Sequence, residues 1–236
     1  MHRYKKTHLW LLIPFFITLF GFSRYWLGFT DAPLEWHLHG LSAVGWYLVL
    51  LAQPWVVNNL SVAQHRKLGM IGIMIAGAVV ASTLNVISGN LDINSGPRVA
   101  LKYSTSLAEL ITVAGFAFSV IAAIFNAKNV DKHAQWMIST VFWVLPPATT
   151  RLAFLIAIGI YGSPENFPFH PFILGALNVL ILVIILAYLI VRYYRKYKLW
   201  AIPYIVVGVF TLLRIFIMFG LKDAAWVKGF IEAIFG

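Results

Sequence analysis

The sequence predicts an all-α integral membrane protein with seven transmembrane helices and one short helix at the membrane surface. Of the 236 residues, 61% are hydrophobic and only 11% are charged, whereas charged residues make up about a quarter of a soluble domain. The apolar residues form stretches of roughly 20 or more, the length that a helix needs to cross the hydrocarbon core of a bilayer. We expect one membrane domain over residues 1–236, with spans at about 9–29, 36–57, 68–88, 100–126, 135–161, 171–191 and 199–220.

The first span follows a basic segment, Met1 to Lys6, that is similar to the start of a signal peptide. No small-residue cleavage site follows it, so we expect an uncleaved first helix. The connections between later spans are short and rich in turn-forming residues, which makes sequence neighbours antiparallel neighbours in space. Within the fifth span, Pro146-Pro147 predicts a kink, because proline removes a backbone hydrogen bond of the helix.

The last segment, 221–236, is too short to span the membrane. Apolar residues recur in it at helical spacing with charged residues between them, which predicts an amphipathic helix lying on the outer membrane surface. The apolar positions are Trp226, Val227, Phe230, Ile231, Ile234 and Phe235.

Basic residues in the connections predict the orientation, because cytoplasmic loops are enriched in Lys and Arg. With the N-terminus inside, the cytoplasmic segments contain most of the 18 basic residues: Arg3, Lys5, Lys6, Arg66, Lys67, Lys128, Lys132, Arg192, Arg195, Lys196 and Lys198. Topology therefore explains the net charge of +10 without nucleic acid as a partner. We expect a bacterial inner-membrane location, with a cytoplasmic N-terminus, a periplasmic C-terminus and the lipid bilayer as the partner.

Ionisable residues inside the spans all lie in the expected outer half of the membrane. Such residues are costly in hydrocarbon and normally face the bundle interior or water. Glu109 and Arg151 lie at matched depths, about 13 Å and about 15 Å from the outer ends of their helices, which predicts an ion pair. With the other buried polar residues they predict a pocket open to the outer face: Arg24, Asn85, Glu109, Arg151, Asn178 and Arg214.

Three arginines against one glutamate favour an anionic occupant of this pocket, such as a lipid headgroup, a carboxylate or the propionates of haem. Two alternatives need no ligand. Arg24 and Arg214 lie near the interface and would extend their charged ends to the headgroups. The kink at Pro146-Pro147 would then only shape helix packing.

Five histidines lie near helix ends: His37, His39 and His170 on the outer side, and His65 and His133 on the inner side. One interpretation pairs His65 with His133, and His39 with His170, as ligands of haem b. A second makes His37, His39 and His170 ligands of a divalent metal ion, together with nearby carboxylates. A third is that these histidines only prefer the headgroup zone. The chain has no cysteine, which excludes thiolate ligands and disulfides.

Short motifs add a resemblance over about residues 37–151. His39-Gly40, Gln53 and His65-Arg66-Lys67-Leu68-Gly69 follow a pattern that resembles uncharacterised families of bacterial multi-pass predicted membrane proteins. The stretch His133-Ala134-Gln135-Trp136-Met137, with the prolines and Arg151 after it, is also similar to such proteins. This resemblance implies the architecture but no activity. The helix-opening histidines also resemble those of transmembrane haem b cytochromes, which implies a redox role.

From the sequence we therefore expect an inner-membrane protein whose Arg- and His-lined pocket opens to the outer face and binds haem or another anionic ligand in a redox role. One alternative is a protein without a redox centre that binds lipid or a small molecule, as a binding protein, a transporter or an assembly factor. The other is a metal-dependent membrane enzyme. The sequence does not identify a reaction, so catalytic residues stay open.

Overall fold

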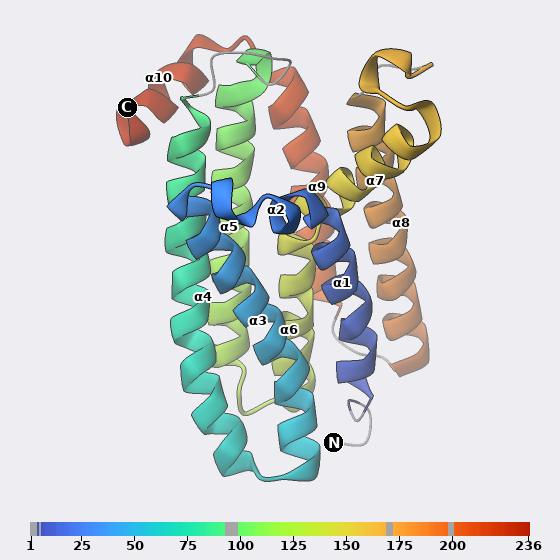
Figure 1. Cartoon of the computed structure of the whole chain (residues 1–236). Coiled ribbons are helices and arrows are strands. Elements are labelled where there is room, and N and C mark those ends of the chain that lie inside the picture. The colour runs from blue at the N-terminus through green and yellow to red at the C-terminus, as the bar shows by residue number, and fades with distance from the viewer. Residues whose placement is uncertain (1–3, 5, 93–98, 169–171, 198–200) are drawn as a thin grey trace.

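The computed structural model describes residues 4, 6–92, 99–168, 172–197 and 201–236. Over these residues the chain is helical, and its long helices run side by side as a bundle (Figure 1). Short 3-10 turns lie at Phe29–Asp31, Val99–Leu101 and Pro164–Asn166. The α-helices are α1 (Thr7–Gly21), α2 (Ser23–Leu27), α3 (Leu34–Asn59), α4 (Val62–Asn90), α5 (Lys102–Phe125), α6 (Val130–Val144), α7 (Pro146–Tyr161), α8 (Phe172–Tyr197), α9 (Ile202–Gly220) and α10 (Ala225–Phe235).

Five of these helices are long and apolar enough to cross a membrane: α3, α4, α5 with the turn before it, α8 and α9. The pair α6 and α7 passes the same test as one span with a bend of 42°. Large apolar side chains such as Met74, Phe125 and Ile184 are exposed on the outside of the bundle, where lipid rather than water is the fitting solvent. The chain is therefore a multi-pass membrane protein in contact with the bilayer.

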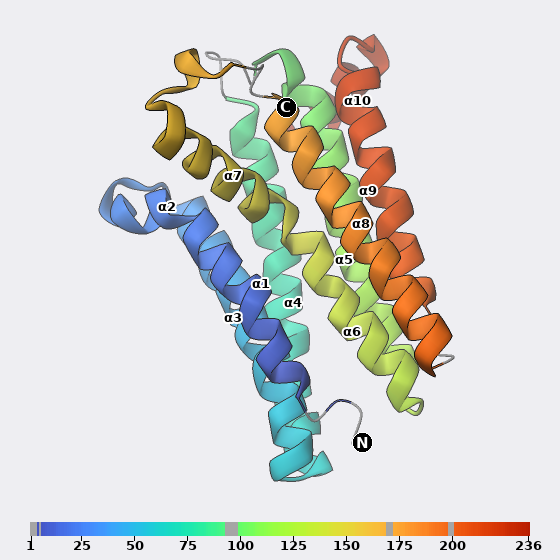
Figure 2. The same cartoon turned by 90° about the vertical axis from the view of Figure 1, so that its right-hand side faces the viewer.

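The first expected span, 9–29, is broken in the structure. Helix α1 has 15 residues and ends at Gly21, and the short helix α2 begins separately at Ser23. Fifteen residues fall short of the roughly 20 that a span needs. Figures 1 and 2 show that the chain turns at α2 well below the upper ends of α4 and α9. A seventh span therefore stays a prediction.

The kink expected at Pro146-Pro147 is confirmed. Helix α6 ends at Val144 and α7 begins at Pro146, which takes the first helical position. Proline fits this position well, because the N–H group that it lacks has no partner within a helix there. The break directs α7 away from the axis of α6, so that α7 packs on α1 and α8 (Figure 2).

The main core lies between α1, α3, α4, α5, α6, α8 and α9. Its largest side chains are aromatic: Trp46, Tyr47, Phe116, Trp143 and Tyr204. Two of these indoles donate hydrogen bonds to hydroxyl groups. Trp46 Nε1 donates to Thr140 Oγ1 at 3.1 Å, and Trp143 Nε1 donates to Ser119 Oγ at 2.8 Å. The core is thus apolar in bulk, and hydroxyl groups accept the indole hydrogens of Trp46 and Trp143.

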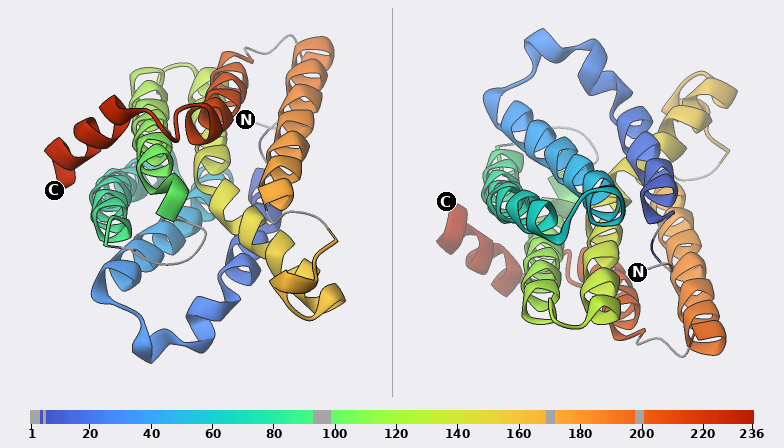
Figure 3. Two further views of the ribbon diagram at one scale, coloured as in Figure 1. Left: turned by 90° about the horizontal axis from the view of Figure 1, so that it is seen from above. Right: turned by 90° about the horizontal axis from the view of Figure 1, so that it is seen from below.

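The helix expected within 221–236 is present as α10. Val227 and Ile231 are buried against α5 and α9, whereas Trp226, Phe230 and Ile234 are exposed on another face. Seen from above, α10 extends outward past the upper end of α5 (Figure 3). Its place at the membrane surface, and on the periplasmic side, stays a prediction.

Candidate functional site

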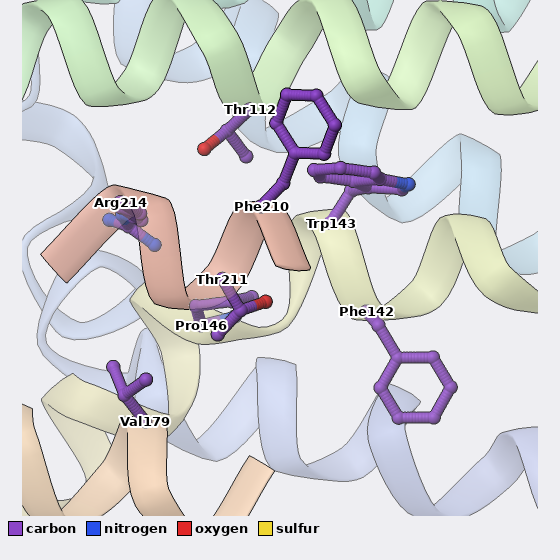
Figure 4. A pocket seen from close by; sticks show the side chains of 8 residues that line it. All are labelled: Thr112, Phe142, Trp143, Pro146, Val179, Phe210, Thr211 and Arg214. Atoms are coloured by element: carbon purple, nitrogen blue, oxygen red, sulfur yellow. The ribbon is translucent and has the colours of Figure 1, made fainter. Parts of the chain in front are cut away.

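A narrow pocket lies at the break between α6 and α7, and Arg214 is its only charged lining residue (Figure 4). The pocket is partly open and has room for about one water-sized group. Its lining comes from five helices, α5 to α9: Thr112, Phe142, Trp143, Pro146, Val179, Phe210, Thr211 and Arg214. The break that Pro146 imposes thus creates a polar spot inside an otherwise apolar bundle.

Arg214 supplies the hydrogen-bond donors of this pocket. Its side chain is half-buried, but its Nε atom is fully enclosed and has no hydrogen-bond partner among the described residues. Thr112 and Thr211 donate their hydroxyl hydrogens to the carbonyls of Ala108 and Val207 in their own helices, at 2.8 and 2.7 Å. An enclosed donor without a partner costs about 1–3 kcal/mol, so an acceptor oxygen entering the pocket would be held by Arg214.

The carboxylate of Glu109 lies on α5, close enough for its negative charge to stabilise the positive charge of Arg214. Helices α5 and α9 pack directly against each other. Both residues were expected in one pocket, with Glu109 paired to Arg151. In the structure the charge of Glu109 also acts on Arg214.

Arg151 lies elsewhere, on the exposed surface of α7. Its guanidinium lies over the ring of Phe22, 4.5 Å from the ring centroid, and donates to the carbonyl of Pro147 at 3.1 Å. Helix α7 packs on α1 and α8, whereas α5 packs on α4, α6 and α9. The expected Glu109–Arg151 ion pair is therefore not supported, because equal depth does not place two residues on facing helices.

Asn178, which was expected to line the pocket, lies behind its wall. It is 7% exposed, and its amide nitrogen donates to Thr150 Oγ1 at 2.9 Å and to the Pro146 carbonyl at 3.4 Å. Pro146 lines the pocket, so this amide stabilises the pocket wall. The other two expected pocket residues, Arg24 on α2 and Asn85 on α4, are exposed and do not line it.

The outer histidines have separate surroundings. His37 Nδ1 lies 2.8 Å from the Tyr25 hydroxyl, and its ring packs on Phe29. His39 Nδ1 lies 3.3 Å from Ser82 Oγ, with the charge of Arg151 acting on it. Among the described residues, no group of three or more His, Asp or Glu side chains is placed to hold a metal ion. His170 lies outside the described residues, so the outer metal site gains no support from these contacts.

The inner histidines, in contrast, come together. The rings of His65 on α4 and His133 on α6 meet edge to face, with centroids 6.0 Å apart. His133 Nδ1 lies 2.8 Å from the carbonyl oxygen of Ala123 on α5. His65 also interacts with the backbone of Gln53 on α3. Four helices thus converge on this pair, at the end of the bundle where α3 joins α4 and α5 joins α6 (Figure 1).

The two inner rings lie close together, with centroids 6.0 Å apart. The pocket at Arg214 lies elsewhere and holds about one water-sized group, which is too small for a porphyrin. Haem as the ligand of His65 and His133 therefore stays a prediction.

Two features of the inner end were not recognised as site residues from the sequence. Gln53 is 8% exposed, and its Oε1 atom has no hydrogen-bond partner among the described residues. Its position in the His-Gly, Gln, His-Arg motif was a signal, since a glutamine near the end of a membrane helix needs partners. The second feature is a chain of hydrogen bonds: Tyr204 donates to Gln135, Gln135 to Tyr4, and Tyr4 to Asp131.

Comparison with protein families, with curated proteins and with solved structures finds no match for this chain. The resemblance of residues 37–151 to bacterial membrane protein families therefore stays a prediction. What the chain shows on its own is an all-helical, multi-pass membrane protein.

Proposed function

We propose that this chain is a multi-pass protein of the bacterial inner membrane that binds the anionic group of a lipid or small molecule at Arg214. The observation that supports the proposal is the enclosed Nε atom of Arg214, which has no acceptor among the described residues. Buried polar groups in membrane proteins are normally paired, because hydrocarbon offers them no partner. A carboxylate or phosphate oxygen is the acceptor that a guanidinium binds most strongly.

The size of the pocket restricts what enters it. With room for about one water-sized group, it would admit a single carboxylate or phosphate oxygen. The rest of the ligand would lie at the open side of the pocket. Apolar lining from Phe142, Val179 and Phe210 suits an acyl chain or another apolar group next to the bound oxygen. This combination favours an amphipathic anion over a small hydrophilic one.

The charge of Glu109 suits the same role. It offsets part of the cost of keeping Arg214 charged in hydrocarbon. The guanidinium therefore keeps its hydrogen-bond donors available. This arrangement supports the expected alternative of a binding protein without a redox centre. It gives no support to the haem interpretation or to a metal-dependent enzyme at the outer face.

The test measures lipid binding by the purified full-length chain. We expect native mass spectrometry to show preferential binding of phosphatidylglycerol over phosphatidylcholine from mixed micelles. Oleate is a second probe that distinguishes a carboxylate from a phosphate ligand. Arg214→Gln should weaken binding of the preferred anion at least about tenfold, because a hydrogen bond to a charged group contributes about 1.5–3 kcal/mol.

Arg192→Gln is the matched control. Arg192 is an exposed arginine on α8 whose guanidinium lies near Tyr188, so its loss removes the same charge without touching the pocket. Equal loss of binding in both variants would mean that only net charge matters. No preference for either anion in the unchanged protein would also refute the proposal.

A further inference from the structure

Two enclosed acceptor atoms near the contact between His65 and His133 receive no hydrogen bond from the described residues: His65 Nδ1 and Gln53 Oε1. His133 Nδ1 lies 2.8 Å from the carbonyl oxygen of Ala123, so this nitrogen carries the ring proton and donates it. In the neutral ring the other nitrogen, Nε2, is then an acceptor. Metal-binding histidines are commonly held in this way, with one N–H donated to a backbone carbonyl.

His65 offers a second lone pair. Its Nδ1 atom is enclosed and has no partner among the described residues. The same ring interacts with the backbone of Gln53. In the neutral tautomer that carries its proton on Nε2, the enclosed Nδ1 atom is a lone pair.

Gln53 adds a third acceptor. Its side chain is more than nine-tenths buried, and its Oε1 atom has no partner among the described residues. Its amide nitrogen lies over Gly69, one turn after His65, where an added Cβ would approach it to 3.4 Å. The enclosed groups without partners here are therefore acceptors, and the partner that they require is a cation or a water molecule.

The distance between the rings fits a single ion. A metal–nitrogen bond is about 2 Å long and an imidazole nitrogen lies about 1 Å from its ring centre, so one bridging ion places ring centroids roughly 6 Å apart. The observed separation is 6.0 Å. A bare ion needs no porphyrin slot, which separates this site from the haem interpretation.

The ligand set selects the ion. No Asp or Glu joins the two histidines among the described residues, and the charge of Arg66 also acts on His65. Asp131 on α6 is engaged by the Tyr4 hydroxyl, and Lys132 adds another positive charge on the same helix. A divalent ion would meet only neutral ligands beside positive charge, and zinc normally takes four ligands. Copper binds imidazole strongly, and the singly charged, d¹⁰ ion Cu⁺ accepts two ligands.

We propose that His65 and His133 bind one Cu⁺ ion, with the amide oxygen of Gln53 beside it. The site is independent of the anion pocket, since none of its residues lines that pocket. Membrane helices α3, α4, α5 and α6 would all be joined through this ion and its supporting contacts. The proposal includes no redox step and no reaction.

The test uses the full-length protein in detergent, stripped of metal and titrated with Cu⁺ under ascorbate without oxygen. We expect one copper per chain after desalting, in competition with a chromogenic Cu⁺ chelator. X-ray absorption at the copper edge should show two short nitrogen neighbours. His65→Gln and His133→Gln should each weaken Cu⁺ binding at least tenfold, and Arg214→Gln should leave it unchanged.

His37→Gln is the control, because His37 is a half-buried histidine held by Tyr25, away from this cluster. Circular dichroism and elution volume show which variants are folded. One folded variant of the two inner histidines is enough for the binding comparison. The X-ray absorption measurement uses the unchanged protein and needs no variant. Less than half a copper per chain, or Cu⁺ binding equal in the inner variants and in His37→Gln, would overturn the proposal. Zn²⁺ binding as tightly at the same histidines would overturn the choice of Cu⁺ and indicate a general metal site.

Discussion

Core side chains in this protein are held in place by hydrogen bonds and by close packing. Trp143 illustrates both, since its indole N–H donates to Ser119 while its ring lies against Gly115. A Cβ atom added at Gly115 would overlap three atoms of that ring. Trp143 is 4% exposed, and the pocket that it lines holds only about one water-sized group, so the ring has little space into which to move. Glycine is therefore required on α5 for close contact with α6.

We expect Gly115→Ala to destabilise the protein by about 1–3 kcal/mol, because an added methyl group overpacks a dense core. The measurement is thermal unfolding in detergent, followed by circular dichroism. Gly159→Ala on α7 is the control, since its added Cβ would meet nothing within 4 Å. Equal melting temperatures for the two variants would show that the contact between Gly115 and Trp143 leaves room for a methyl group.

At the scale of elements, the inner end is joined by a directed chain of hydrogen bonds. Tyr204 on α9 donates to Gln135 on α6 at 2.5 Å, and Gln135 donates to Tyr4 before α1 at 3.1 Å. Tyr4 then donates to Asp131 at 2.9 Å. Gln135 and Tyr204 are each 1% exposed. This chain connects the N-terminal segment to two helices that are distant in sequence.

Tyr204→Phe should cost about 1–3 kcal/mol, because it leaves a buried glutamine oxygen without its donor. Tyr188→Phe is the comparison, since Tyr188 is exposed and its hydroxyl only accepts from Arg192. Denaturation in detergent would measure both. A loss of stability as small in Tyr204→Phe as in Tyr188→Phe would contradict a structural role for the chain.

The break between α1 and α2 is a second element-scale feature. A Cβ atom at Gly21 would overlap the backbone carbonyl of Ala148, so α1 and α7 meet with their backbones in contact. Glycine at the end of α1 allows this crossing, and the helix stops at the same point. Small residues allow such close approach between membrane helices. The apolar composition of residues 9–29 alone indicates one continuous span instead.

For the whole molecule, the arrangement of charges predicts how the bundle sits in the membrane. The connection between α5 and α6 contains Lys128 and is followed by Lys132, whereas the turn after α7 contains Glu165. These connections lie at opposite ends of the bent span formed by α6 and α7. The excess of basic residues in cytoplasmic loops places the first inside the cell and the second outside.

Single cysteines test this orientation cleanly, because the natural chain contains none. In intact spheroplasts, a membrane-impermeant maleimide should label Glu165→Cys. It should label Ala127→Cys, which is also at an exposed position, only after the membrane is opened. The cysteine-free chain is the blank. Labelling of Ala127→Cys in sealed cells with protection of Glu165→Cys would establish the reverse orientation.

The sequence alone determined the fold class, the later spans, the kink at Pro146 and the presence of α10. Each depends on local composition: apolar stretches of fixed length, a proline, or apolar residues at helical spacing. It also identified Arg214, Glu109, Asn178, His65 and His133 as polar residues that need partners. The cost of burying a polar group in hydrocarbon is a property of the residue and its position along the helix.

Only the tertiary structure decided which of these residues meet. Depth along the helix is readable from the chain, but rotation about the helix axis and the choice of neighbouring helix are set by packing. For this reason Glu109 acts on Arg214 across the α5–α9 interface, while Arg151 faces outward on α7. For the same reason His65 on α4 meets both Gln53 on α3 and His133 on α6, although His133 is distant from the other two in sequence.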